Sequence, residues 1–319
     1  MTERVLVTGA NGFVGQALLT ALAEHARWQP LALVRRRPEH GADSIVAVGD
    51  INASTDYAGV VQAGDVIVHL AARVHVMDDR STDPLQAYRQ VNVDGTLNLA
   101  RQAAAAGARR FVFVSSVKVN GESTTGAPPF DETTAPAPQD AYGQSKLEAE
   151  QGLLALARDT GMEVVILRPP LVYGPGVKAN FRSLMVLAAK PLPLPFASVG
   201  NRRSMVFVGN LVDLVIRCLD HPAAANEVFL VSDGQDVSLR SLLTLMRAAA
   251  GRGPGLFPVP PALFHLLGKL TGRAAVVDRL LGDLQVDSHK AQRLLGWQPP
   301  YSVARGVALA MQDLTNGSH

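Results

Sequence analysis

Short apolar runs and helical patterns alternate along the first half of the chain. Runs at residues 5–8, 30–35, 44–48, 65–70, 110–115 and 164–168 predict buried strands. Between them, residues 16–24 and 85–106 place apolar side chains at helical spacing. Apolar strands separated by helices are typical of a parallel sheet that helices cover on both faces. We therefore predict an α/β fold with a doubly wound parallel sheet and a ligand site at the carboxyl ends of its strands.

The pattern changes after residue 168, where prolines and glycines interrupt regular structure. A late strand is predicted at 226–231, and helices at 239–250 and 302–314. These features predict a first domain at 1–168 and a smaller α/β domain at 169–319. We expect the second domain to return elements to the sheet and to form the far wall of a cleft.

Composition excludes several classes of protein. The 319 residues are 47% hydrophobic, so a large core can form, and the net charge of +2 is too small to indicate nucleic-acid binding. A single cysteine, Cys218, allows no disulfide framework and fits a reducing compartment. With no signal peptide and no apolar run of transmembrane length, we expect a cytoplasmic protein without a membrane span.

Three glycines follow the first predicted strand and precede the first helix: Gly9, Gly12 and Gly15. This context predicts a dinucleotide site rather than a plain strand-turn-helix, which is the alternative. Gly9 permits a tight turn, Gly12 leaves room for a pyrophosphate, and Gly15 lets the helix pack close to the strand. The helix N-terminus would direct its amides at the phosphates.

A tyrosine and a lysine four residues apart, Tyr142 and Lys146, share one face of a predicted helix. A nearby ammonium lowers the pKa of a phenol, which makes it a general acid–base near neutral pH. Ser116 follows the strand at 110–115, where its hydroxyl can bond a reacting oxygen. Each feature has an ordinary alternative: the Tyr/Lys pair can be a helix start, and the serine can belong to a turn. The order of the glycine loop, the serine and the Tyr/Lys pair along the chain favours a catalytic role.

Together with other segments, these features resemble the extended short-chain dehydrogenase/reductase family, of the NAD-dependent epimerase/dehydratase type. The matching segments are 8–15, 49–51, 69–72, 92–96, 115–116, 142–146 and 167–176. The resemblance implies a Rossmann sheet and a homodimer. It implies that Tyr142 is the acid–base, that Lys146 holds the nicotinamide ribose, and that Ser116 binds the reacting oxygen. The cofactor contacts that it implies are Gly9, Asn11, Gly12, Phe13, Val14, Gly15, Asp50, Ile51, Leu70, Ala71, Ala72, Asn92, Tyr142, Lys146 and Pro169.

Within that family the chain looks like the branch that acts on nucleotide-diphosphate sugars. Arg203 resembles the arginine that grips the substrate diphosphate, and Asn180 resembles a residue that meets the diphosphate and the base. Arg279 is a further diphosphate candidate, and Lys118 and Ser116 complete the implied substrate contacts. The alternatives are a surface charge pair for the arginines and a helix start for Asn180.

The predicted strand at 30–35 bears on the choice of cofactor. It ends in Arg35-Arg36-Arg37 and lacks the acidic residue that selects NAD. Arg35 and Arg36 can pair with a 2′-phosphate, which favours NADP(H), with NAD(H) as the alternative if the arginines form a solvated loop. A reductase exchanges its coenzyme at each turnover, so this prediction also favours reduction.

The family contains three chemistries that bear on this chain. Val117-Lys118 stands where dehydratases carry Asp-Glu, which argues against dehydration. Segments 115–121, 169–181 and 281–287 resemble bacterial UDP-4-keto-6-deoxy-N-acetylhexosamine 4-reductases of surface-polysaccharide synthesis. We therefore expect an NADPH-dependent 4-ketoreductase. The alternative is a UDP-hexose or UDP-N-acetylhexosamine 4-epimerase with tightly bound NAD.

The remaining features of the sequence are less specific. The eight histidines are scattered, so no metal site is predicted, and His69 is expected to be packed. Residues 256–270 form the most apolar stretch of the second half and predict a core or lid helix, with a membrane-contacting surface as the alternative. A non-enzymatic dinucleotide-binding regulator is the remaining functional alternative.

Overall fold

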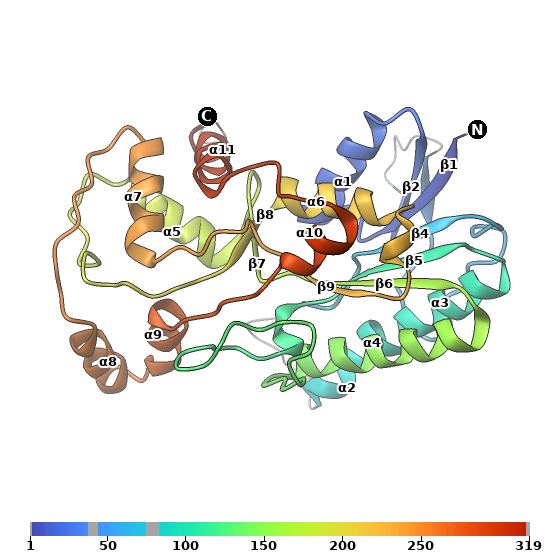
Figure 1. The fold of residues 1–319 in the computed structure, drawn as a ribbon, viewed down its shortest axis with the longest axis horizontal. Coiled ribbons are helices and arrows are strands. Elements are labelled where there is room, and N and C mark those ends of the chain that lie inside the picture. Colours follow the sequence, from blue (N-terminus) through green and yellow to red (C-terminus); the bar gives the residue numbers. More distant parts are fainter. Residues whose placement is uncertain (1, 38–43, 75–82, 317–319) are drawn as a thin grey trace.

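A parallel sheet of seven strands forms the centre of the protein (Figure 1). The computed structural model describes residues 2–37, 44–74 and 83–316. The strand order is β3-β2-β1-β4-β5-β6-β9, and every neighbouring pair is parallel. The strands are β1 (Glu3–Thr8), β2 (Trp28–Val34), β3 (Ile45–Ala47), β4 (Val66–His69), β5 (Arg110–Val114), β6 (Glu163–Arg168) and β9 (Val228–Leu230). The prediction of a doubly wound parallel sheet is confirmed.

Helices cover both faces of this sheet, as strands that are apolar on both sides require. Helices α1 (Phe13–Ala23) and α6 (Val208–Cys218) pack on one face, in a buried cluster that includes Val5 and Val7 of β1. Helices α3 (Thr96–Ala105) and α4 (Ala141–Thr160) pack on the other face, against Leu6 and Phe111. Alternate residues of β1 therefore belong to different cores.

The helix predicted at 85–106 has the expected extent but contains an interruption. It consists of α2 (Pro84–Arg89), a π-helical segment at Gln90–Gly95, and α3. A Cβ at Gly95 would lie 2.8 Å from Ile51 Cγ2, so the segment passes close to the chain that follows β3. π-helical turns often occur at functional sites, and this one carries Asn92.

The second half adds a small sheet and a group of helices. Strands β7 (Leu171–Tyr173) and β8 (Met205–Phe207) pair in parallel, and β9 joins the large sheet beside β6, as the late strand at 226–231 was expected to do. The other helices are α5 (Ala179–Ala189), α7 (Leu239–Ala249), α8 (Pro261–Leu270), α9 (Ala274–Leu281), α10 (His289–Leu295) and α11 (Val303–Asn316). One buried cluster runs from β1 to α11. The division between residues 168 and 169 stays a prediction.

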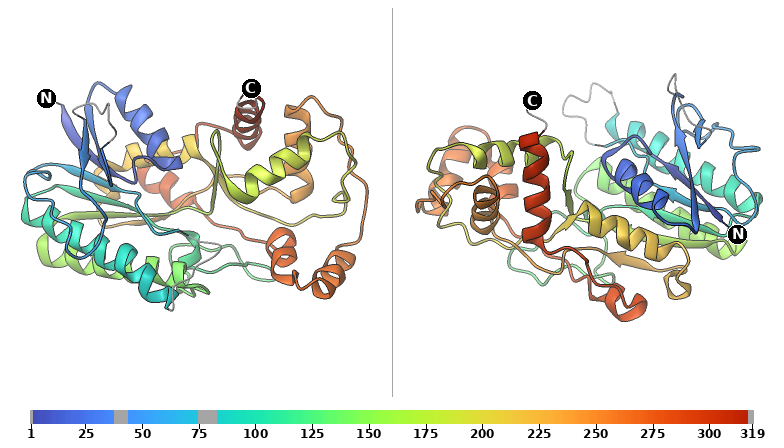
Figure 2. Two further views of the ribbon diagram at one scale, coloured as in Figure 1. Left: turned by 180° about the vertical axis from the view of Figure 1, so that it is seen from behind. Right: turned by 90° about the horizontal axis from the view of Figure 1, so that it is seen from above.

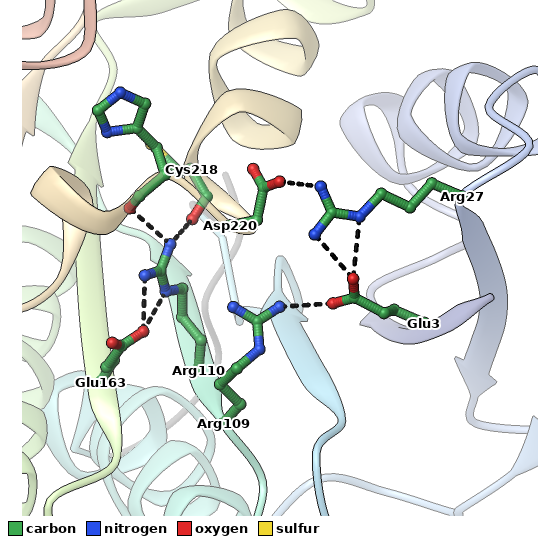
Figure 3. A network of polar contacts seen from close by, with 8 residues as sticks. Glu3, Arg27, Arg109, Arg110, Glu163, Cys218 and Asp220 are labelled. Atoms are coloured by element: carbon green, nitrogen blue, oxygen red, sulfur yellow. Dashed lines mark hydrogen bonds and ion pairs between the residues drawn. The ribbon is translucent and has the colours of Figure 1, made fainter. Parts of the chain in front are cut away.

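A network of ion pairs and hydrogen bonds ties the amino-terminal edge of the sheet to the end of α6 (Figure 3). Arg110 is 1% exposed, pairs with Glu163, and donates from Nη1 to the carbonyl oxygen of Cys218 at 2.6 Å. Nearby, Arg27 pairs with both Glu3 and Asp220. The network fixes the edge of the sheet opposite to the glycine loop.

Candidate active site

The glycine loop connects β1 to α1 at the carboxyl edge of the sheet. Gly9 has φ +65°, and a Cβ there would lie 2.7 Å from the backbone nitrogen of Ala71. A Cβ at Gly15 would lie 2.3 Å from Gly9 O. The predicted tight turn and close helix packing are therefore confirmed, and both positions require glycine.

The first turn of α1 is open to an anion. Gly12 precedes the helix and is exposed, no side chain caps the helix, and no acidic residue lies in its first turn. The free amides and the positive end of the helix dipole suit a pyrophosphate. Asn11 is also exposed here, while Phe13 and Val14 are half-buried.

The segment that follows β4 lies against this loop. Thr8 Oγ1 accepts hydrogen bonds from the amides of Leu70 and Ala71, each at 3.2 Å. His69 lies buried between Thr8 Oγ1 at 2.8 Å and Thr96 Oγ1 at 2.9 Å, and its burial lowers the pKa of its imidazole to about 3. The prediction of a packed histidine is confirmed. Like Leu70 and Ala71, Ala72 is half-buried.

The residues after β2 and β3 that were predicted to contact the cofactor lie near one another. Arg35 and Asp50 follow β2 and β3, and Arg35 Nε lies 2.7 Å from Asp50 Oδ1 in an exposed ion pair. Arg36 is exposed beside them, and Ile51 is half-buried against Gly95. The sequence suggested separate roles for Arg35 and Asp50, but the structure pairs them.

Asn92 is placed differently from the other expected cofactor contacts. It is 1% exposed, and its Nδ2 donates to Arg73 O and to Ser145 Oγ, while its Oδ1 accepts from the Arg73 amide at 2.7 Å. Its amide group is thus engaged by the chain itself. Asn92 therefore holds the segment after β4 against α4, and a direct contact of Asn92 with the cofactor stays a prediction.

Helix α4 carries the predicted acid–base pair. Asp140 caps it by accepting from the Gly143 amide at 2.7 Å, so Tyr142 and Lys146 lie in its first two turns. Lys146 is 2% exposed, and its Nζ donates to Val114 O at 2.9 Å. The same Nζ lies 5.9 Å from the centre of the Tyr142 ring. The two side chains therefore meet at the carboxyl end of β5.

The two serines that follow β5 differ. Ser116 is half-buried, and its Oγ accepts from the Lys118 amide at 3.2 Å, which leaves its hydroxyl proton to donate elsewhere. Ser115 is 4% exposed, and its Oγ has no hydrogen-bond partner in the described part of the chain. Buried hydroxyls are normally bonded to protein, water or a ligand, so the Ser115 hydroxyl is available to an atom from outside the chain, and no sequence signal separated it from Ser116. Pro169 is also buried, and its carbonyl oxygen accepts a hydrogen bond from the Val117 amide at 2.9 Å.

The pKa directions in this site differ from the expectation. Burial, followed by the charges of Asp140 and Tyr88, raises the pKa of Tyr142 above its ordinary value instead of lowering it. Burial lowers the pKa of Lys146 to about 7, and the nearby carboxylate of Glu150 opposes this shift. The expected lowering of the Tyr142 pKa is therefore wrong for the chain by itself, because desolvation and the neighbouring Asp140 and Tyr88 all disfavour the phenolate.

A cavity of about 650 Å³ holds two of the predicted substrate residues, Arg203 and Arg279. Arg203 Nη1 donates to the carbonyl oxygens of Arg279 at 2.8 Å and Gly282 at 3.2 Å, and burial lowers the pKa of its guanidinium. Glu122 also lines the cavity, 3.7 Å from Arg279 Nε. Guanidinium groups pair well with phosphates, and the role of these two arginines at a diphosphate stays a prediction.

The remaining predicted substrate contacts, Lys118 and Asn180, do not line this cavity. Lys118 Nζ pairs with Glu122 at 2.8 Å and with Asp140 at 2.5 Å, so it links the cavity to the cap of α4. Sequence reasoning missed Glu122 and Asp140, although an aspartate three residues before Gly143 is a capping signal. Asn180 is exposed at the start of α5 and lines neither this cavity nor a neighbouring one of about 720 Å³.

The described residues give no support for other kinds of site. Within 2–37, 44–74 and 83–316, no three His, Cys, Asp or Glu side chains form a group that could hold a metal ion. Among the helices in these ranges, none has the length and apolar character needed to cross a bilayer. By contrast, the glycine cradle, the open helix N-terminus and the unbonded Ser115 hydroxyl fit a dinucleotide.

Comparisons with known proteins agree with this geometry. A UDP-glucose 4-epimerase of Vibrio cholerae is 49% identical over 313 residues, which are 98% of this chain and 95% of that protein. A GDP-6-deoxy-D-mannose reductase of Pseudomonas aeruginosa is 31% identical over 258 residues, covering 77% of this chain and 80% of that protein. The solved structure of MoeE5 in complex with UDP-glucose and NAD matches with a TM-score of 0.77 at 25% identity, over 99% of this chain and 100% of that one. A family model matches residues 5–232. The chain therefore belongs to the NAD dependent epimerase/dehydratase family.

Proposed function

We propose that the protein is a 4-epimerase of UDP-hexoses that keeps NAD bound. The observation that carries the proposal is the 49% identity, over nearly the whole length of both chains, with a UDP-glucose 4-epimerase. The sequence alone ranked 4-keto reduction first. This comparison favours epimerisation over reduction, because the GDP-6-deoxy-D-mannose reductase is only 31% identical to the chain and matches a shorter part of it.

The residues at the end of β5 and the start of α4 carry the proposed chemistry. When bound, NAD supplies a reversible hydride acceptor. Tyr142 Oη takes the proton of the sugar's 4-hydroxyl and later returns it to the 4-keto oxygen. Ser116 donates a hydrogen bond to that same oxygen and stabilises its developing charge. Because burial raises the Tyr142 pKa, the phenol of the chain by itself is neutral, and it must release its own proton to solvent before it can act as the base. A Lys146 ammonium, 5.9 Å from the ring centre, then stabilises the phenolate that accepts the proton of the sugar.

The cavity at the other end of the site suits the substrate's diphosphate. Arg203 is a half-buried cation that donates to backbone carbonyls, so a diphosphate, with one negative charge on each phosphate, offers it a stronger acceptor. Arg279 is 64% exposed and shares Glu122 with Lys118. We infer that Arg279 turns from Glu122 to the diphosphate, while Lys118 holds Glu122 in place.

The first test needs no added coenzyme. The purified protein is expected to release NAD on denaturation, and to convert UDP-glucose into UDP-galactose until an equilibrium mixture forms, as chromatography of the nucleotide sugars would show. An epimerase returns its hydride to the substrate, so the product forms without net oxidation or reduction. A protein that retains no dinucleotide, leaves UDP-glucose unchanged and oxidises NADPH with a UDP-4-keto-6-deoxy-N-acetylhexosamine would contradict the proposal.

That contrary outcome defines the second candidate, an NADPH-dependent 4-ketoreductase. One observation favours it: β2 is followed by Arg35 and Arg36 instead of an acidic residue. The ion pair with Asp50 weakens this argument, because it neutralises Arg35 and holds a carboxylate beside its guanidinium.

The coenzyme preference can be measured with two substitutions that split this ion pair. Asp50→Asn frees Arg35 and removes a negative charge, so it is expected to shift the ratio of the NADH and NADPH dissociation constants about fivefold toward NADPH, the size expected of an exposed charge pair. Arg35→Ala is expected to shift the ratio in the opposite direction. Fluorescence titration with both coenzymes measures the ratio.

Asp159→Asn, which changes the same charge at the exposed end of α4, is the matched control and should leave the ratio unchanged. An unchanged ratio in both test variants would mean that the arginines form a solvated loop away from the coenzyme.

A further inference from the structure

Helix α8 presents an apolar face to solvent. Leu263, Leu266, Leu267 and Leu270 are 45%, 54%, 50% and 75% exposed. Their spacing puts all four on one side of the helix. Val276 of α9 is exposed as well. Scattered exposed apolar residues are ordinary, but a continuous stripe on one helix marks an interaction surface.

The opposite face of α8 already holds the helix in the protein. Phe264 stacks on Phe196 with 5.4 Å between ring centres, and Gly268 packs so closely on α9 that a Cβ would lie 2.8 Å from Val277. His265 lines the cavity that contains the two arginines. The exposed leucines are therefore not needed to dock the helix, and substitutions among them should preserve the fold.

Basic side chains lie at the carboxyl end of α8. Lys269 and Arg273 are exposed, one within the helix and one just after it. The acidic side chain of this segment, Asp278, lies 3.2 Å from His265 Nδ1. An apolar helix face with cationic side chains beside it is the pattern of a helix that lies in the interface of an anionic bilayer.

We propose that the outer face of α8 docks on an anionic lipid surface. The leucines would enter the boundary between headgroups and acyl chains, while Lys269 and Arg273 would lie among the negatively charged headgroups. Figures 1 and 2 show α8 and α9 at the end of the molecule away from the seven-stranded sheet, so a flat surface can reach the face. The inner face of the same helix borders the cavity, so docking places the cavity close to the membrane.

A second copy of the chain fits this face less well. The helix has ten residues and is about 15 Å long. Its stripe is small compared with the roughly 800 Å² per partner of a stable interface.

The test is sedimentation of the dinucleotide-loaded protein with vesicles. We expect binding to vesicles of phosphatidylcholine with phosphatidylglycerol, weaker binding to phosphatidylcholine alone, and release by salt. The double variant Leu266→Gln/Leu270→Gln should lower the partition coefficient at least about tenfold, because glutamine keeps the helix but removes the apolar contact. The matched control is Val186→Gln/Leu294→Gln, which changes exposed apolar residues on α5 and α10 and should bind like the unmodified protein.

Lys269→Gln/Arg273→Gln tests the charges separately and should abolish the preference for the anionic vesicles. This variant keeps the proposal testable if the leucine variant does not fold. Absence of the unmodified protein from the anionic vesicle pellet, or equal binding by the leucine variant, would overturn the proposal. So would a dimer, seen by light scattering, that the leucine variant abolishes, because a second copy would then cover the face.

Discussion

Replacing Tyr142 with phenylalanine is expected to lower kcat by about 10²- to 10⁴-fold, the usual contribution of a positioned acid–base. The substitution removes only the hydroxyl. The ring remains in its edge-on contact with Tyr88, with 6.2 Å between ring centres, and Lys146 keeps its bond to Val114 O. Retention of the dinucleotide should therefore be unchanged. Turnover of UDP-glucose and the absorbance of the bound coenzyme would measure the two effects separately.

Tyr88→Phe is the matched control for this prediction. It removes a hydroxyl from the neighbouring ring, where Oη donates only a long bond of 3.4 Å to Val74 O. We expect its kcat to stay within a few-fold of the unmodified enzyme. Near-normal turnover of the Tyr142 variant would remove Tyr142 from the chemistry.

Gly15→Ala is expected to lower dinucleotide affinity about 100-fold and to destabilise the fold by about 1–3 kcal/mol. The added Cβ would lie 2.3 Å from Gly9 O and 2.8 Å from Ala10 Cα. Both are backbone atoms, so the loop itself must move, and the amides at the start of α1 move with it. Titration with NAD and thermal unfolding would measure the two effects.

The control is Gly253→Ala, because a Cβ at Gly253 meets no atom within 4 Å. Both substitutions add the same methyl group and reduce the freedom of the unfolded chain equally. A Gly15 variant that binds NAD as tightly as the control would show that the close packing of α1 on the loop does not position the cofactor.

Periodicity and glycine spacing predicted the features that depend on local sequence. The apolar runs located the strands of the large sheet, since a strand buried on both faces must be apolar throughout. Gly9 and Gly15 lie at backbone positions that reject a side chain, so their spacing also reports on structure. The four-residue separation of Tyr142 and Lys146 fixed their common face on α4.

Features that depend on partners far along the chain could not be predicted in this way. Arg35 and Asp50 are fifteen positions apart in sequence but form an ion pair because β2 and β3 are neighbours. The direction of the Tyr142 pKa shift depends on how much of the side chain is buried, which spacing does not reveal. The role of Asn92 depends on Arg73 and Ser145, which reach it from two other elements.

The position of β9 affects how the protein can fold during synthesis. This strand, at Val228–Leu230, completes the edge of the sheet next to β6, and α6 just before it covers the same face as α1. A nascent chain that has left the ribosome only as far as β6 has the glycine loop, Tyr142 and Lys146, but it leaves one strand edge, and the part of the sheet face that α6 covers, open to water. Unpaired strand edges and bare apolar faces favour aggregation. We therefore expect a fragment truncated at residue 168 to aggregate more readily than the complete chain.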